Sequence, residues 1–248
     1  MVNPPYQFIF TGRIVIKKII TSCFIIGLSA CALTSKSSNT VTTLSDSLTH
    51  WENVYSDGEA KIVKNEIQLI SNGNWFFLSK KQYSNFIFEA EILMPDVKEY
   101  SNSGFIFRAQ VRPHKNGNGQ EAYGYQAEVD PSNRKWSGGL YDQGRRQWLN
   151  PLHKKRSNPD SDFIENKSTQ WTDEKSNAYK HLQWNKYRIE AQGSEIKIFV
   201  NNVLTTHVID VKDSQGYIGI QHHGSKAFKK NGDRENTVKF RNIKITEL

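Results

Sequence analysis

Alternating side chains between residues 102 and 148 constrain the fold of this 248-residue chain more than any other feature. Successive side chains of a β-strand point to opposite faces, so a period of two predicts strands. The runs 102–108, 124–130 and 136–142 show that period, with apolar side chains on one face. The other face carries polar groups, which are Arg108, Gln126, Glu128, Asp130 and Tyr141. We therefore expect three adjacent strands with a hydrophobic core on one side and a polar, ligand-binding floor on the other.

Short strands are expected along the rest of the chain as well. The same reasoning predicts them at 66–70, 75–78, 86–94, 184–192, 196–200, 204–209, 217–223 and 237–246. Residues 173–181 are expected to form no more than a helical turn, and 112–120 and 150–169 are expected to be loops. About eleven short strands without a repeat predict an all-β fold, a sandwich or jelly roll of two antiparallel sheets.

The first thirty-one residues have the pattern of a targeting segment. Basic residues precede an apolar stretch, 19–30, that is too short to favour a membrane-spanning helix. The stretch ends in Leu28-Ser29-Ala30-Cys31, which resembles a bacterial lipobox. We expect a signal peptide at 1–30, a lipid on Cys31, a flexible tether at 31–49 and a folded domain at 50–248. An ordinary signal peptide or an uncleaved anchor is the alternative reading.

The expected location follows from the same segment. Ala32 follows the cysteine and no acidic run comes after it. By analogy with lipoprotein sorting, this favours a lipid-anchored protein of the bacterial outer membrane that faces the periplasm, with surface display left open.

Charge and cysteine content exclude several classes of protein. Loss of the three basic residues of the signal lowers the net charge from +8 to +5, and the remaining Lys and Arg are scattered. Nucleic-acid binding, which needs a basic stripe with stacking aromatics, is therefore not expected. The only other cysteine, Cys23, lies in the signal. No cofactor is indicated, and although Asp130 and Asp142 could contribute to a calcium site, surface roles are favoured.

Several runs of the chain resemble a known family. They are Asn102–Arg108, Gly124–Asp130, Gly138–Asp142, Gly216–Gly224 and Phe240–Ile245. In this order they are similar to the 3-keto-glycoside 1,2-lyase and 3-keto-2-hydroxy-glucal hydratase family, also called 3-keto-disaccharide hydrolase. The resemblance covers about residues 50–248. It implies a concanavalin A-like jelly roll whose concave face binds sugars, with an oxidised glycoside as the substrate.

The resemblance also implies a reaction. A ketone at C3 makes the C2 proton of a glucoside acidic, so a base, an acid and a group that stabilises the enolate are needed. We expect Glu128 as the base or the acid, Arg108 as the group that holds the enolate oxygen, and His223 as a proton shuttle. Family members often have Glu at the position of Gln126 and Gln at the position of Glu128, which leaves open which position carries the acid.

The remaining expected substrate contacts are polar or aromatic residues near these three. They are Gln126, Asp130, Tyr141, Asp142, Arg146, Trp148 and Gln221. Trp136 is expected in the core and His222 in a structural role. Each charged residue has a simpler reading as a surface ion pair, and each aromatic as a core residue. The alternative functions are a lipid-anchored carbohydrate-binding module without catalysis and a structural envelope protein.

Overall fold

The computed structural model describes residues 12, 39–115, 117, 119–168 and 170–248. Apart from residue 12, the expected signal peptide lies outside the described residues, as do Cys31 and the rest of 31–38 in the expected tether. The contacts divide the chain into two units, Met1–Ser37 and Ser38–Leu248, and the fold below is that of the second. Among the residues that the structure describes, no helix is long and apolar enough to cross a membrane.

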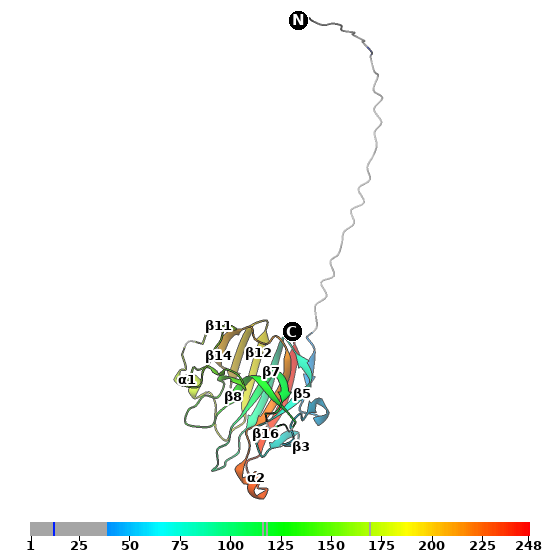
Figure 1. Ribbon diagram of the computed structural model, residues 1–248, viewed down its shortest axis with the longest axis vertical. Helices are drawn as coiled ribbons and strands as arrows, with labels where there is room; N and C mark the ends of the chain where they lie inside the picture. Colours follow the sequence, from blue (N-terminus) through cyan, green and yellow to red (C-terminus); the bar gives the residue numbers. More distant parts are fainter. Residues whose placement is uncertain (1–11, 13–38, 116, 118, 169) are drawn as a thin grey trace. The chain divides into compact units, whose positions relative to one another are not determined.

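Two antiparallel sheets form the second unit. The 9-stranded sheet has the order β11 (Phe163–Asn166), β14 (Val203–Asp210), β13 (Glu195–Val200), β12 (Asn185–Gln192), β6 (Phe86–Leu93), β16 (Val238–Glu247), β4 (Glu66–Ile70) and β3 (Glu59–Val63), with β1 (Val41–Thr43) paired to β16. The 7-stranded sheet has the order β10 (Gln147–Asn150), β9 (Leu140–Gln143), β8 (Gln120–Val129), β7 (Ser103–Pro113), β15 (Gly216–His222), β5 (Trp75–Tyr83) and β2 (Trp51–Glu52). The expected all-β, concanavalin A-like jelly roll of two antiparallel sheets is confirmed (Figure 1).

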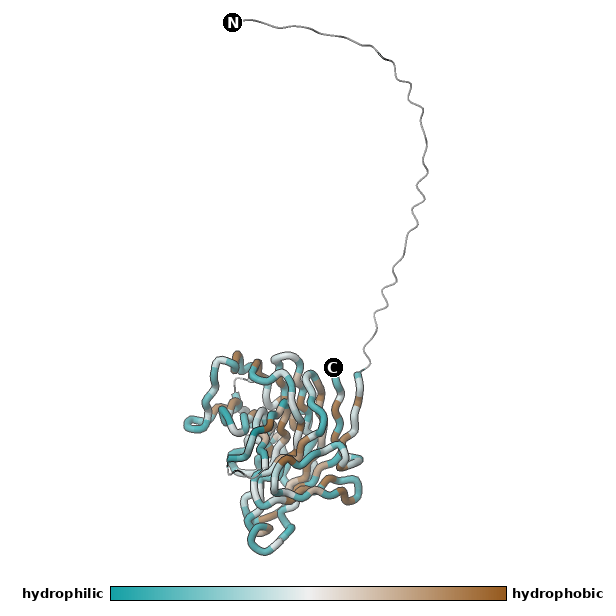
Figure 2. Tube along the Cα trace, turned by 45° about the vertical axis from the view of Figure 1, so that its right-hand side comes forward, coloured by the Kyte–Doolittle hydropathy of each residue, from teal (hydrophilic) through white to brown (hydrophobic). Residues whose placement is uncertain are grey.

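The core lies between the two sheets. Phe105 of β7 is the centre of an aromatic cluster, because its ring lies 5.3 Å from that of Phe88 and 5.8 Å from that of Phe240, both in the other sheet. Phe107 and Tyr125 continue the cluster along the 7-stranded sheet at a ring distance of 5.6 Å. Figure 2 shows the hydrophobic segments concentrated in the strands and the hydrophilic ones in the surrounding loops. The odd-numbered residues of 105–107 in β7 and of 125–129 in β8 therefore face the core, as the alternation predicts.

A smaller apolar cluster lies on the outer face of the 7-stranded sheet. It contains Phe76, Leu78 and Ile106, and it is covered by Val54 and Tyr55 from the segment after β2. That segment therefore covers part of the outer face and leaves another part open.

The folded unit begins earlier than the sequence indicated. Residues 41–43, which lie within the expected tether at 31–49, pair with Lys244–Thr246 as strand β1. The 3-10 helix η1 (Leu48–His50) follows, with Ser47 as its N-cap. The boundary expected at residue 50 is therefore wrong, because backbone hydrogen bonds to β16 fix a segment whose composition alone resembles a linker.

Helices are short. The expected helical turn at 173–181 is present as α1 (Asp173–Ser176). A second helix, α2 (Lys226–Asn231), was not expected. Ser225 Oγ accepts a hydrogen bond from the backbone N–H of Phe228, and Gly232 ends the helix with a φ of 78°. These two caps stabilise a helix of only six residues.

Candidate functional site

A pocket of about 190 Å³ opens on the uncovered part of the outer face of the 7-stranded sheet. Its floor comes from β8, where Gln126 and Glu128 point away from the core because Tyr125 and Ala127 point into it. The walls come from strands β9, β10 and β15, and from the segments before β7, before β9, after β10 and after β15. The lining residues are Tyr100, Asn102, Gln126, Glu128, Arg134, Tyr141, Gln143, Trp148, Arg156, Gln221 and His223.

Glu128 is a buried carboxylate at this floor, with 5% of its surface exposed. Asn102 Nδ2 donates a hydrogen bond to Oε1 at 2.5 Å, and Gln126 Nε2 donates to Oε2 at 3.1 Å. Burial raises the pKa of Glu128 to about 7, although the hydrogen bond from Asn102 opposes this shift. The carboxyl group therefore exchanges a proton near neutral pH, where a general base or acid is most effective.

Gln126 is held by two acceptors and keeps one free acceptor of its own. Its Nε2 donates to Glu128 Oε2 and to Gln221 Oε1, both at 3.1 Å. Its Oε1 is buried and has no hydrogen-bond partner among the described residues. Glycine at position 104 makes this orientation feasible, because a Cβ there would lie 2.5 Å from Gln126 Nε2. The free carbonyl oxygen is a candidate acceptor for a ligand hydroxyl.

Aromatic rings form one wall of the pocket. The ring of Trp148 lies 5.2 Å from that of Tyr141 and 4.8 Å from that of Trp136, edge to face in both cases. Trp148 Nε1 is buried without a hydrogen-bond partner in the described part of the chain. The prediction that Trp136 belongs to the core is wrong, because this ring is half-buried and packs against Trp148 of the pocket wall.

Two arginines reach the pocket from loops. Arg134 lies over the face of Trp148, with Cζ 5.0 Å from the ring centre, and its Nε donates to Asp130 at 2.7 Å. Arg156 Nη2 donates to the Tyr141 hydroxyl at 3.3 Å. Neither was expected here, since loop residues have no alternation pattern and the run 154–156 reads as solvated charge. Nor were Tyr100, Asn102 and Gln143 expected as contacts.

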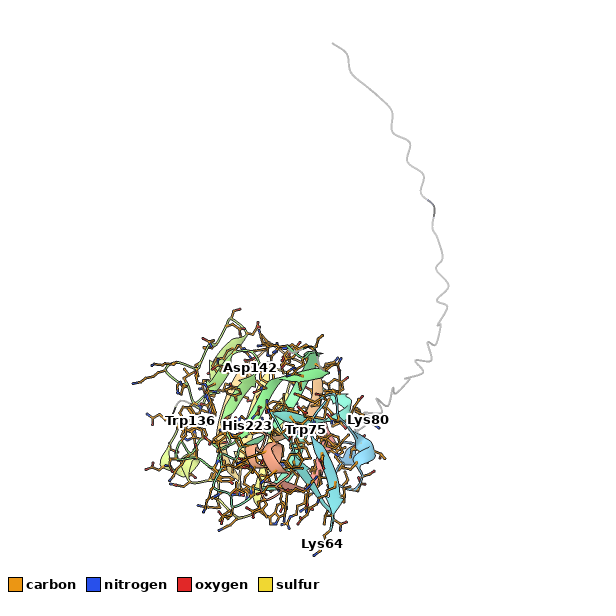
Figure 3. All side chains as sticks on the ribbon, turned by 60° about the horizontal axis from the view of Figure 1, so that its bottom comes forward. Lys64, Trp75, Lys80, Trp136, Asp142 and His223 are labelled. Atoms are coloured by element: carbon orange, nitrogen blue, oxygen red, sulfur yellow. The ribbon has the colours of Figure 1, made fainter. Side chains whose placement is uncertain are left out.

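His223 lies at the rim of the pocket, just after β15 (Figure 3). Strand alternation predicts that His223 shares a face with Gln221, and both side chains line the pocket. Its ring packs edge to face against Tyr100 at 5.2 Å, and partial loss of solvent lowers the pKa of the imidazole. Its neighbour His222 is buried, accepts from the Gly224 N–H and lies 2.8 Å from the Asn236 carbonyl, which is the structural role expected for it.

Arg108 does not line the pocket, and its expected place beside Glu128 is wrong. The pairing of β7 with β8 shifts between Phe107 and Gln110, and Arg108 has a positive φ of 46°. This bulge moves the side chain away from the polar face. The buried guanidinium instead donates to the carbonyls of Ser84, Gly193 and Asp213, at 2.7 to 3.1 Å. Arg108 therefore joins three turns of the fold.

Three other expected contacts also lie outside the pocket lining. Asp130 is buried behind Arg134, to which it is ion-paired. Asp142 is on the opposite face of β9 from Tyr141 and pairs with Arg146 Nε at 2.5 Å. Arg146 also pairs with Asp210 of β14 at 2.9 Å. The guanidinium of Arg146 therefore links Asp142 of β9 to β14. Gln126, Tyr141, Trp148 and Gln221 are the expected substrate contacts that the structure brings together with Glu128 and His223.

Metal binding has no evident donor set. Within the described ranges, no group of three or more His, Cys, Asp or Glu side chains could hold a metal ion. Asp130 and Asp142, the acids considered for calcium, each face an arginine instead.

Comparison with known proteins supports the assignment of this fold. The sequence profile of the 3-keto-alpha-glucoside-1,2-lyase-like domain matches residues 40–246. No curated protein matches the chain with significance. A candidate glycosyl hydrolase from Parabacteroides distasonis has a TM-score of 0.51 at 14% identity, with 84% of this chain and 94% of that chain covered. The carbohydrate binding module CBM66 from Bacillus subtilis has a TM-score of 0.47 at 18% identity, covering 79% and 94%. At 14% identity, the match to the glycosyl hydrolase establishes the fold alone.

Proposed function

Because the chain belongs to the family of 3-keto-alpha-glucoside-1,2-lyase-like domains, we propose that it cleaves 3-keto-glycosides by elimination, with Glu128 as the base. The observation that carries this proposal is the buried carboxyl of Glu128, whose pKa of about 7 suits proton abstraction at neutral pH. Both of its oxygens already accept amide hydrogen bonds, which favour the carboxylate form.

The elimination needs no external oxidant or reductant. Glu128 takes the proton from C2, and the electron pair of that C–H bond moves onto the C3 ketone oxygen as an enolate. The enolate then re-forms the ketone, makes the C1–C2 double bond and expels the oxygen at C1, which takes up a proton. His223, at the rim, supplies that proton and recovers it from solvent. Addition of water to the unsaturated product completes a net hydrolysis.

Stabilisation of the enolate falls to residues that the alternation did not reveal. Arg134 and Arg156 are the two guanidinium groups in the lining. A fixed cation near a developing negative charge lowers the barrier most where water is excluded. In this proposal Arg134 and Arg156 stabilise the enolate, which is the role that the sequence analysis expected of Arg108.

Recognition of the sugar follows from two unsatisfied atoms. Six buried side-chain atoms of the described residues have no hydrogen-bond partner, and four of them belong to arginines and aspartates that are ion-paired with one another. The other two, Gln126 Oε1 and Trp148 Nε1, belong to residues that line this pocket. One accepts and the other donates, which suits the hydroxyl groups of a sugar.

The test is release of product from a 3-keto-disaccharide and from its unoxidised parent, by the wild type and by Glu128→Gln, with and without a chelator. We expect cleavage of the keto form alone and loss of that cleavage in the variant. Cleavage of neither compound, with saturable sugar binding by calorimetry, would instead identify a carbohydrate-binding module without catalysis. Full activity of Glu128→Gln would exclude Glu128 as the base.

We also propose that a lipid on Cys31 anchors the protein in the bacterial cell envelope, on the basis of the lipobox-like Leu28–Cys31. In a bacterial host, labelling with a fatty-acid probe should mark the full-length chain but not Cys31→Ser. Equal labelling of both would exclude this anchor.

A further inference from the structure

A second cavity adjoins the pocket on the outer face of the 7-stranded sheet. It encloses about 380 Å³ between that sheet and the segment after β2. Gln143 lines both cavities. Asn74, in the second cavity, accepts a 2.6 Å hydrogen bond from Gln221, which lines the first. The two cavities are therefore neighbours that share a polar boundary.

Strand β8 runs beneath both cavities. Gln126 and Glu128 lie in the first, and Glu121 and Ala122 in the second. Gln126 and Ala122 are four residues apart, or about 13 Å along a strand. Gly124, midway between them, has no side chain to divide the floor. A glycoside that places its sugar over Glu128 can therefore extend its second part along β8 into the second cavity.

The second cavity offers hydrogen-bonding groups that the protein itself leaves unused. Asp57 makes no ion pair with any described residue, whereas Glu121 is paired with Arg112 at 2.7 Å. The amide of Gln143 and the Nδ2 group of Asn74 likewise have no hydrogen-bond partner in the part of the chain that the structure describes. One unpaired carboxylate and two free amides suit hydroxyl groups and oppose a second negative charge.

We propose that this second cavity, the leaving-group cavity, binds the part of the substrate that departs from C1, and that Asp57 selects neutral, hydroxyl-bearing leaving groups over anionic ones. The proposal rests on the elimination proposed above. The first cavity, at about 190 Å³, is smaller than most ligand pockets and suits a single ring. A carboxylate or phosphate on the leaving group would lie near the unpaired carboxylate of Asp57 and be repelled.

The test compares two 3-keto-glycosides that differ only at C6 of the leaving sugar, glucose in one and the corresponding uronic acid in the other. We expect the wild type to prefer the neutral leaving group in kcat/KM by about tenfold at low salt. Asp57→Asn should narrow that preference, and Asp57→Lys should reverse it. Glu174→Gln removes the same charge from the exposed surface of α1, which lines neither cavity, and should keep the wild-type preference.

The outcomes separate this inference from the proposed function. Equal kcat/KM for the two substrates in the wild type, or a preference that does not change in either Asp57 variant, would overturn the role of the leaving-group cavity. The elimination would still stand if Glu128→Gln abolished cleavage of both substrates. Cleavage of neither substrate by the wild type would overturn both proposals.

Discussion

Gln126 Nε2 lies 3.1 Å from Glu128 Oε2, and the two side chains share the outer face of β8. This contact joins the amide that keeps a free acceptor to the carboxylate whose pKa burial raises to about 7. Binding and proton transfer therefore depend on adjacent outward positions of one strand. The first two predictions follow from the titration of Glu128.

In His223→Gln, which lacks the proposed proton donor, the rate of cleavage should depend on pH with a single ascending limb. A base must be deprotonated, so kcat/KM should fall tenfold per pH unit below about 7 and level off above it. Initial rates on a 3-keto-disaccharide between pH 5 and 9 measure this profile. A profile that falls as pH rises through 7 would indicate that Glu128 acts as the acid.

The free energy of unfolding should also depend on pH through the titration of Glu128. The folded-state pKa is raised from 4.5 to about 7, so the folded state binds more protons than the unfolded state in that window. The contribution of Glu128 to the free energy of unfolding should therefore be full below pH 4.5 and fall by about 3 kcal/mol as pH rises to 7. Urea denaturation should show that this part of the pH dependence is missing in Glu128→Gln. If this pH dependence persisted in Glu128→Gln, the assigned pKa would be contradicted. Glu174→Gln is the matched control.

Replacing Trp148 by Phe should weaken sugar binding without much change in folding. Phe keeps most of the ring but lacks the Nε1 donor, so one hydrogen bond to the ligand is lost, at a cost of about 1 kcal/mol or roughly fivefold in Kd. Calorimetry of a 3-keto-disaccharide with Glu128→Gln, with and without Trp148→Phe, isolates binding from turnover. Trp184→Phe, whose ring packs under Arg241 in the other sheet, should bind as the parent does. Unchanged affinity in Trp148→Phe would show that the indole does not contact the sugar.

Arg108 should matter for stability and not for chemistry. Arg108→Met leaves the carbonyls of Ser84, Gly193 and Asp213 without their donor, so we expect a loss of about 3 kcal/mol or more in the free energy of unfolding. Arg241→Met, which breaks a partly exposed ion pair with Glu91, should cost about 1 kcal/mol or less. Urea denaturation measures both. A variant at position 108 that is as stable as the wild type but inactive would restore its expected catalytic role.

The sequence predicted the interior of this fold and missed its edges. The five strands that alternation did not reveal are β1, β2, β3, β10 and β11. Four of them are the outermost strands of the two sheets, and β1 pairs only with β16. Edge strands bury less of either face, so their sequences carry a weaker alternation of apolar and polar residues.

The residues of the candidate site likewise divide into those that strand alternation predicted and those that it missed. Glu128, Gln126, Tyr141 and Gln221 were predictable because strand period alone assigns a face to each residue. Arg108 was misplaced because one extra residue in β7 resets that period, so that Ile106 and Ala109 fall in the same outer cluster. Arg134 and Arg156 come from loops, where no period exists.

The sequence by itself thus determined the fold class, the interior strands and the polar face of β8, because burial of one face imposes a period of two on every interior strand. Only the tertiary structure decided which charges reach the pocket. A buried charge goes to whichever partner the folded chain brings near it, and that partner can be far away in sequence. Arg108 and Arg146 are therefore bound within the fold, whereas Arg134 and Arg156 lie beside Glu128.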